Sequence, residues 1–212
     1  VQLDNAGLHQ LLQDRVVLVT GAGGSIGSEL CRQIALIGPG RLVCFDLSEL
    51  ALYTLKEEFT SRWPALSIVC AIGDVKNARR VDEIMRAHRP AVVFHAAAYK
   101  HVPLMEEVNA WEAVCNNTWG TYVVGRAAIE HGVEKFVLVS TDKAVNPTNV
   151  MGATKRLAEM TCQSLHTEGK TRFEMVRFGN VLGSSGSVIP KFRDQIAQGG
   201  PVTVTHPDIV RY

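Results

Sequence analysis

The sequence has 212 residues, of which 46% are hydrophobic and 20% charged, so it can bury one sizeable core. Lysine and arginine number 22 against 21 acidic residues, which gives a formal net charge of +1, and no run of like charge stands out. This balance argues against a nucleic-acid partner and against a membrane-surface contact by this segment.

Short β-branched apolar runs alternate with segments of helical periodicity along the chain. Continuous apolar runs suit strands covered on both faces, and strict alternation of strand and helix predicts an α/β fold with a doubly wound parallel sheet. The expected strands are Arg15–Thr20, Arg41–Asp46, Leu66–Cys70, Ala91–His95, Lys135–Ser140 and Arg172–Arg177. The expected helices, several of them opened by Ser or Asn, are Ile26–Ile37, Ser48–Phe59, Asn77–His88, Asn109–His131 and Met151–His166.

A glycine-rich turn follows the first expected strand directly, in the run Thr20-Gly21-Ala22-Gly23-Gly24-Ser25-Ile26-Gly27. Gly21 permits a sharp turn, Gly24 lets the backbone approach a pyrophosphate, and Gly27 allows close packing of helix on strand. Ser25 and Ile26 open the helix and belong to the same expected site. The order strand, glycine turn, helix predicts dinucleotide binding, with a plain turn as the alternative.

Two acidic residues follow later strands of the expected sheet. Asp46 ends the second strand, where a carboxylate accepts hydrogen bonds from adenosine ribose hydroxyls and repels a 2′-phosphate, so NAD is favoured over NADP. The alternative for Asp46 is a helix cap for Ser48–Phe59. Asp74 and Val75 follow the third strand, where an acidic side chain can meet the adenine amine, and a plain loop aspartate is an equal alternative.

The glycine spacing Gly-x-x-Gly-x-x-Gly after a threonine resembles the short-chain dehydrogenase/reductase family, especially its extended branch of nucleotide-sugar enzymes with a Rossmann fold. The resemblance implies that Ala96, Ala97 and Ala98 form the small-residue wall beside the nicotinamide ribose. The run Asn117-Thr118-Trp119-Gly120-Thr121 is similar to the family's Asn-x-x-Gly-Thr helix signature. Without the resemblance, the three alanines are simply strand-end packing.

The run Ser140-Thr141-Asp142-Lys143 ends the fifth expected strand, and Met151-Gly152-Ala153-Thr154-Lys155 opens the next helix. In the family, a strand-end Ser or Thr works with a Tyr-x-x-x-Lys pair on one helix face, the tyrosine as base and the lysine on the ribose. This chain carries Met151 at the tyrosine position, and a thioether carries no proton at neutral pH. The resemblance implies that Lys155 binds the nicotinamide ribose, while the base must be another group.

Four segments together closely resemble bacterial UDP-N-acetylglucosamine 4,6-dehydratases that have methionine in place of tyrosine. They are Tyr99–Pro103, Ser140–Lys143, Asn146–Met151 and Arg177–Ser187, and the resemblance runs from about Val16 to Tyr212. It implies a UDP-sugar substrate for O-antigen, capsule or glycan synthesis, and NAD as a retained hydride carrier.

The same resemblance implies that Lys143 is the base at C5 of the sugar, Asp142 the acid for the departing C6 hydroxyl, and Thr141 a partner of the C4 oxygen. Lys143 must then be partly neutral, which desolvation in a closed cleft can achieve. Asp142, or a water held by Thr141, takes the C4 hydroxyl proton. Considered alone, these residues have the alternative of a surface ion pair and, for Met151, of a core methionine.

Cations and amide donors suit the phosphate oxygens of a sugar nucleotide, although each such residue alone is more often structural. The candidates are Arg177, Asn180, Lys191 and Arg211, of which Asn180 has the better family match. Lys100 and His101 are candidates for sugar contacts, with a solvated loop pair as the alternative.

Two other classes of function stay open. A sugar 4-epimerase or reductase of the same branch depends on the tyrosine that this chain lacks. A non-catalytic NAD-binding module has no use for an ionisable pair beside Thr141.

Five widely spaced cysteines predict a reduced protein without disulfides or a metal site, and no apolar stretch approaches the roughly 20 residues of a bilayer span. We expect a cytoplasmic chain, or the soluble domain of an inner-membrane protein. Residues 1–180 are expected to form the NAD-binding domain and 181–212 the beginning of a substrate-binding lobe. The two longest helices match those that pair in family dimers, so we expect a homo-oligomer.

Overall fold

The structure is a computed structural model that describes residues 4–179, 181 and 188–203, with the backbone alone for 188–191. The chain divides into two compact units, Val1–Arg177 and Phe178–Tyr212. This division lies close to the boundary expected after residue 180. That the second unit begins a substrate-binding lobe stays a prediction.

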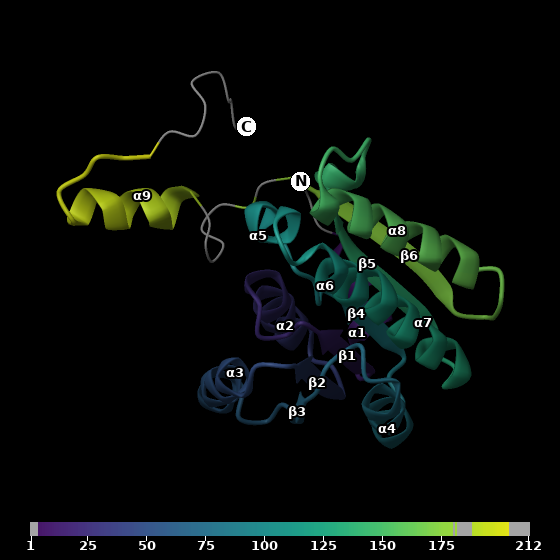
Figure 1. Ribbon diagram of the computed structural model, residues 1–212. Helices are drawn as coiled ribbons and strands as arrows, with labels where there is room; N and C mark the ends of the chain where they lie inside the picture. Colours follow the sequence, from purple (N-terminus) through teal and green to yellow (C-terminus); the bar gives the residue numbers. More distant parts are fainter. Residues whose placement is uncertain (1–3, 180, 182–187, 204–212) are drawn as a thin grey trace. The chain divides into compact units, whose positions relative to one another are not determined.

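The first unit is built on a six-stranded sheet in the order β3-β2-β1-β4-β5-β6 (Figure 1). The pairs β1–β2, β2–β3, β1–β4 and β4–β5 are parallel, so the predicted fold class is confirmed. Thr20 lies in register with Phe45 on one side and His95 on the other, so three strands end at one level of the same sheet edge. The strands are β1 Val16–Thr20, β2 Arg41–Asp46, β3 Ile68–Ile72, β4 Val92–His95, β5 Lys135–Thr141 and β6 Arg172–Phe178.

Helices cover both faces of this sheet, and each face has its own apolar core. Val17 and Val19 pack with α1, α2 and α3, whereas Leu18 packs on the opposite face with α4, α7 and α8. Alternate residues of one strand are thus buried on opposite faces, which explains the continuous apolar runs. The helices are α1 Asn5–Leu12, α2 Ser25–Ile37, α3 Glu49–Arg62, α4 Ala78–His88, α7 Gly120–Glu130 and α8 Val150–Leu165.

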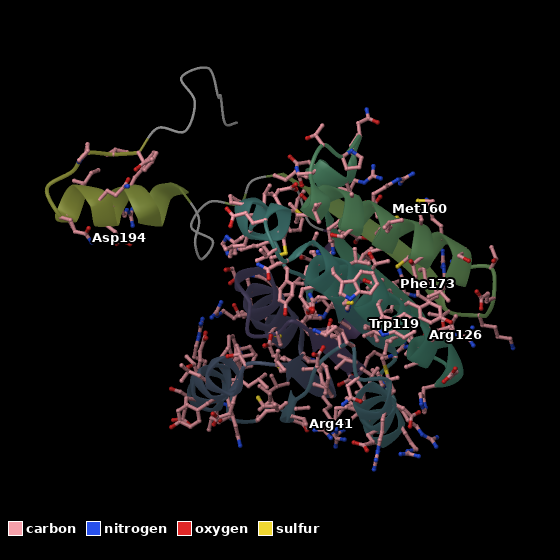
Figure 2. All side chains as sticks on the ribbon, viewed as in Figure 1. Arg41, Trp119, Arg126, Met160, Phe173 and Asp194 are labelled. Carbon is pink, nitrogen blue, oxygen red and sulfur yellow. The ribbon has the colours of Figure 1, made fainter. Side chains whose placement is uncertain are left out.

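Phe173 of β6 belongs to the second of these cores (Figure 2). Its ring centroid lies 4.9 Å from that of Phe136 of β5. Gly125 of α7 approaches the same ring so closely that a Cβ would lie 3.3 Å from it. Aromatic packing under α7 therefore holds the edge strand β6 against β5.

One expected strand and one expected helix differ from the structure for a local reason. The third strand begins at Ile68 rather than Leu66, because the Leu66 N–H donates to the Trp63 carbonyl and closes the turn after α3. The helix expected at Asn109–His131 is interrupted. It consists of α6 Ala110–Ala113, the π-helix η1 Val114–Trp119 and α7. A π turn inserts an extra residue, and here it buries Asn116 and Asn117.

Further elements were not expected from the sequence: α1, α5 Val102–Glu106, the 3₁₀ turn η2 Asp142–Ala144, and α9 Val188–Ala197. In the second unit, the Gln195 amide both donates to Thr203 Oγ1 at 2.7 Å and accepts from the Thr203 N–H at 3.1 Å. This contact joins α9 to the segment that follows it. Within the described residues, no helix combines the length and hydropathy that a bilayer span requires.

Candidate active site

The glycine turn joins β1 to α2 at the carboxyl edge of the sheet. Gly21 has φ +68°, and a Cβ there would lie 2.5 Å from the Ala97 nitrogen. A Cβ on Gly27 would collide with the Gly21 carbonyl oxygen, whereas a Cβ on Gly24 would meet only that oxygen, at 3.3 Å. Because Gly24 is the N-cap of α2, it offers no capping side chain to the first amides of the helix. The amino end of α2, where Ser25 and Ile26 lie, therefore presents the positive end of the helix dipole, which suits an anion.

Asp46 links the end of β2 to this turn. Its Oδ2 accepts from the Gly23 N–H at 2.9 Å, and its Oδ1 accepts from the Ser48 N–H at 2.8 Å. The side chain of Ser48, not that of Asp46, caps α3 by accepting from the Ala51 N–H. The helix-cap alternative for Asp46 is therefore wrong, and its carboxylate faces the cavity described next.

A cavity of about 350 Å³ lies beside the glycine turn at the ends of β1, β2, β3 and β4. Of the residues predicted for the cofactor, eight line it: Gly21, Gly24, Asp46, Asp74, Val75, Ala96, Ala97 and Ala98. Eight lining residues were not predicted: Gly23, Phe45, Leu47, Ser48, Ala51, Gly73, Tyr99 and Asn116. Within the cavity wall, Asp74 forms an ion pair with Lys76 (Oδ2–Nζ, 3.2 Å).

Lys155 of α8 is 4% exposed, and its Nζ finds no hydrogen-bond partner among the residues that the structure describes. Burial lowers the pKa of this amine from its ordinary 10.5 to about 8. A buried ammonium without acceptors is costly unless a ligand provides them. Lys155 therefore fits a group with hydroxyl oxygens, as the sequence predicts for the nicotinamide ribose.

His95, at the end of β4, is fully buried near this ammonium. Burial, with a smaller contribution from the Lys155 charge, lowers the pKa of the ring to about 3, so the imidazole is neutral. Because the Thr121 hydroxyl donates to the Asn117 carbonyl, it must accept from His95 Nε2 at 3.1 Å. His95 Nδ1 then accepts from the Thr20 hydroxyl at 2.7 Å. This network fixes the histidine tautomer and ties β1 and β4 to α7.

Thr141, Asp142 and Lys143 lie together at the carboxyl end of β5. Lys143 Nζ contacts Asp142 Oδ1 at 3.0 Å, and the Thr141 hydroxyl donates to the same oxygen at 3.0 Å. Burial raises the pKa of Asp142, but the hydrogen bonds from Lys143 and Thr141 lower it by more. The net pKa therefore lies below its usual range. The Lys143 side chain is 37% exposed, so the desolvation expected for a base is not in place in this state.

Met151 stands on the first turn of α8 and is 5% exposed. Its thioether packs with Met105 of α5 and Ala113 of α6. Met151 thus packs in the core, which was one of the two alternatives that its sequence position offered. Gly152, the next residue, brings the helix against η2, since a Cβ there would collide with the Lys143 carbonyl oxygen.

Glu159 of α8 was not predicted, although its carboxylate is completely buried. Arg177 binds it through two nitrogens, Nε at 2.7 Å and Nη2 at 2.6 Å. These contacts occupy two donors of the guanidinium, and a role of Arg177 in substrate binding stays a prediction. The signal in the sequence was the spacing of Lys155 and Glu159, which places both on one helix face.

The other residues predicted for the substrate are not brought together by the described structure. Lys100 and His101 are exposed on the loop between β4 and α5. Asn180 and Arg211 lie outside the described residues, and Lys191 lies in α9 with its side chain outside them. Their roles stay predictions.

The profile of a family described as "Polysaccharide biosynthesis protein" matches residues 17–212. The chain is 52% identical to the capsular polysaccharide biosynthesis protein CapD of Staphylococcus aureus and 50% identical to the probable polysaccharide biosynthesis protein EpsC of Bacillus subtilis. Both matches cover 100% of this chain and 36% of the relative, so the chain spans about a third of their length.

A UDP-glucose 4-epimerase of Rickettsia rickettsii is 36% identical, over 94% of this chain and 58% of that protein. Among solved structures, Pen from Bacillus thuringiensis superposes with a TM-score of 0.87 at 40% identity, over 92% of this chain and 61% of that one. The dTDP-glucose 4,6-dehydratase DesIV from Streptomyces venezuelae, solved with NAD bound, superposes with a TM-score of 0.76 at 20% identity, over 88% and 63%. At that identity, the likeness to DesIV concerns the fold alone.

Proposed function

Because the chain belongs to the polysaccharide biosynthesis protein family, we propose that it is the NAD-binding part of a nucleotide-sugar 4,6-dehydratase. The proposed reaction converts UDP-N-acetylglucosamine to a UDP-4-keto-6-deoxy-N-acetylhexosamine for bacterial polysaccharide. The observation that carries the proposal is the Asp142–Lys143 pair at the carboxyl end of β5, on the sheet edge that also holds the cofactor cavity. Ligands of doubly wound sheets bind at this edge.

Four features of the first unit fit NAD. The amino end of α2 suits a pyrophosphate because of its helix dipole, and Gly24 leaves space for it. The Asp46 carboxylate suits ribose hydroxyls and opposes a 2′-phosphate. The buried Lys155 amine has no acceptor among the described residues, and the hydroxyls of the nicotinamide ribose would provide one. When bound, NAD supplies hydride transfer from C4 of the sugar and back to C6, with no net redox change.

The hydrogen-bonded pair can generate an acid and a base together. Transfer of one proton from Lys143 Nζ to Asp142 Oδ1, across 3.0 Å, converts an ammonium and a carboxylate into an amine and a carboxylic acid. Loss of water from the site on substrate binding favours this neutral form, because burial disfavours both charges. The exposed ion pair seen here is then the resting state.

In this neutral form, Lys143 removes the C5 proton and Asp142 protonates the C6 hydroxyl, which leaves as water. The elimination returns the pair to its ionic form. Lys143 then gives its proton back to C5. The C4 hydroxyl proton, carried by a water on Thr141, restores the proton that Asp142 lost. Met151 takes no part in these transfers, which is consistent with its packing in the core.

The test is NMR of UDP-N-acetylglucosamine with the full-length protein in deuterated water. We expect deuterium at C5 and loss of the C6 hydroxyl. Lys143→Ala should lower turnover at least about 100-fold while NAD binding persists, because general acid–base groups contribute factors of this size. Unchanged turnover in Lys143→Ala would contradict the proposed mechanism.

A matched control is available on the same strand. Lys135 begins β5 and pairs with Glu174 at 3.1 Å, at the opposite edge of the sheet. Lys135→Ala removes an ion-paired lysine without touching the site, so turnover should stay within twofold of wild type.

A second candidate is a nucleotide-sugar 4-epimerase, which the 36% identity to the Rickettsia rickettsii protein favours. The same spectrum separates the two. An epimerase inverts C4 and keeps the C6 hydroxyl. A chain that binds NAD but leaves the sugar intact is instead a non-catalytic module.

A further inference from the structure

The buried carboxylate of Glu159 is the meeting point of four donors. Oε1 accepts from the Ser140 hydroxyl at 2.7 Å and from Arg177 Nε at 2.7 Å. Oε2 accepts from Arg177 Nη2 at 2.6 Å and from Arg156 Nη1 at 3.0 Å. Burial raises the pKa of Glu159, but the hydrogen bonds from Arg177, Ser140 and Arg156 lower it to about 2, so the group is ionised at neutral pH.

These contacts connect three elements that are distant in sequence. Ser140 lies next to the end of β5, Glu159 and Arg156 are on α8, and Arg177 is near the end of β6. Figure 1 shows α8 lying along these two strands. The cluster therefore fixes the carboxyl end of β5 against the helix that carries Lys155.

Ser140 immediately precedes Thr141, Asp142 and Lys143. Its hydroxyl is committed to Glu159, so Thr141 supplies the hydroxyl group beside the acid–base pair. None of the four clustered residues belongs to the proposed proton transfers. Their link to those transfers is the backbone between Ser140 and Lys143, which also packs against α8 at Gly152.

Stability alone is a weak reason for this arrangement. Two well-packed apolar residues in place of a buried ion pair often stabilise a fold equally well or better. A carboxylate held by a two-nitrogen arginine contact instead imposes direction, because each hydrogen bond has a narrow range of distance and angle. The geometry thus favours a role in alignment.

We propose that Glu159 is a positioning residue that, through Ser140, holds the Thr141–Lys143 segment in register with α8. This inference rests on the proposed dehydratase function for its kinetic consequences. Its structural consequence, a fixed Thr141–Lys143 segment, does not depend on the identity of the substrate.

The decisive variant is Glu159→Met combined with Arg177→Met in the full-length protein, because it removes the carboxylate together with the arginine that binds it through two nitrogens. It also frees the Ser140 hydroxyl from its acceptor, which is the link under test. We expect kcat for UDP-N-acetylglucosamine to fall at least tenfold, with KM changed less than threefold and the unfolding midpoint close to wild type. Hydrogen exchange at the Lys143 amide, which donates to Thr141 Oγ1, should become at least tenfold faster.

Ser140→Ala tests the same link without disturbing the ion pair, should the double variant fail to fold. It too is expected to lower kcat at least tenfold. The matched control is Glu58→Gln, since Glu58 binds Arg32 through two nitrogens, both at 2.8 Å, between α2 and α3. That variant should lower stability but leave kcat and Lys143 exchange unchanged.

Wild-type kcat and wild-type exchange in either the double variant or Ser140→Ala would overturn the proposal. A wild-type protein that leaves UDP-N-acetylglucosamine intact would instead contradict the proposed function, and the exchange rates would still decide the role of Glu159.

Discussion

The site has two halves, the cavity beside the glycine turn and the end of β5 with α8, and they use different kinds of chemical group. Around the cavity, the chain uses backbone and small residues: Gly24 and the three alanines from Ala96 line the space for a ligand, and Gly21 and Gly27 allow close packing of the backbone. At the end of β5 and along α8, it uses ionisable side chains, of which Lys155 and Glu159 are almost or completely buried. The first half depends on shape and the second on charge.

This difference determines how each half responds to change. A tightly packed backbone turn is destabilised when a substitution adds an atom that has no space, and this loss of stability does not depend on pH. A buried charge changes stability with pH, because its protonation differs between the folded and unfolded chain. Substitutions and titrations should therefore separate the two halves.

The largest effect is expected for Gly27→Ala. The new methyl group would collide with the carbonyl oxygen of Gly21 and lie within 3 Å of Ala22 Cα, and backbone atoms cannot move aside cheaply. We expect the unfolding free energy to fall by about 3 kcal/mol, measured by urea denaturation without ligand. A loss within experimental error would show that the turn is not tightly packed.

Gly24→Ala is the matched control in the same turn. Its methyl group would meet only the Gly21 carbonyl oxygen, at 3.3 Å. Stability should change by less than about 1 kcal/mol, whereas NAD affinity, measured by calorimetry, should fall at least tenfold because the methyl group occupies the space proposed for the pyrophosphate.

The next effect has the opposite sign. Lys155→Met should raise the unfolding free energy of the ligand-free protein at pH 7 by roughly 2 kcal/mol, since it removes a buried ammonium whose pKa has dropped from 10.5 to about 8. The same variant should lose NAD affinity. Stabilisation and loss of binding by one substitution would identify Lys155 as a residue kept for a ligand.

The pH dependence of the wild type checks this explanation. Between pH 8 and 10.5, the unfolded chain keeps a proton on Lys155 that the folded chain has released. The unfolding free energy contributed by this group therefore rises with pH across that window. Lys155→Met should lack this rise, and an identical pH profile in both proteins would contradict the buried-charge explanation.

The smallest effect is expected far from the site, at Asp82→Asn. His131 Nε2 donates to Asp82 Oδ1 at 2.7 Å and joins α7 to α4, and this hydrogen bond holds the pKa of Asp82 below its usual range. The pair is only part-buried at the protein surface, so the urea midpoint at neutral pH should fall only slightly. Because the folded pKa is lowered, this contribution exists above the ordinary value of 3.8 and is lost as the pH falls through the folded value.

Glu83→Gln is the control for that measurement. Glu83 pairs with Arg79 and Arg80 inside α4, and within the described part of the chain no hydrogen bond or ion pair links it to α7. It should shift the urea midpoint less than Asp82→Asn does. An equal shift would mean that the His131 contact between helices adds nothing.

The sequence by itself determined the sheet and the position of the glycine turn, because both rest on local signals. Each apolar run lies on a single strand, and the turn from Gly21 to Gly27 is contiguous, so neighbouring residues carry the whole pattern. Asp46 was predicted from its place at the end of a strand, and the structure places it in the cavity wall. Its N–H partner Gly23 was not predicted, because the contact joins two loops.

Only the tertiary structure decided the interior of the second half. The π turn at Val114–Trp119 keeps a helical pattern in the sequence, and nothing local shows that Asn116 and Asn117 turn inward. In the sequence, Glu159 has an ordinary position on a helix. Only the fold brings Ser140 of β5 and Arg177 of β6 to its carboxylate. Burying the charge of Glu159 requires hydrogen-bonding partners, and these come from two strands and its own helix, so the packing of the whole sheet decides which partners meet.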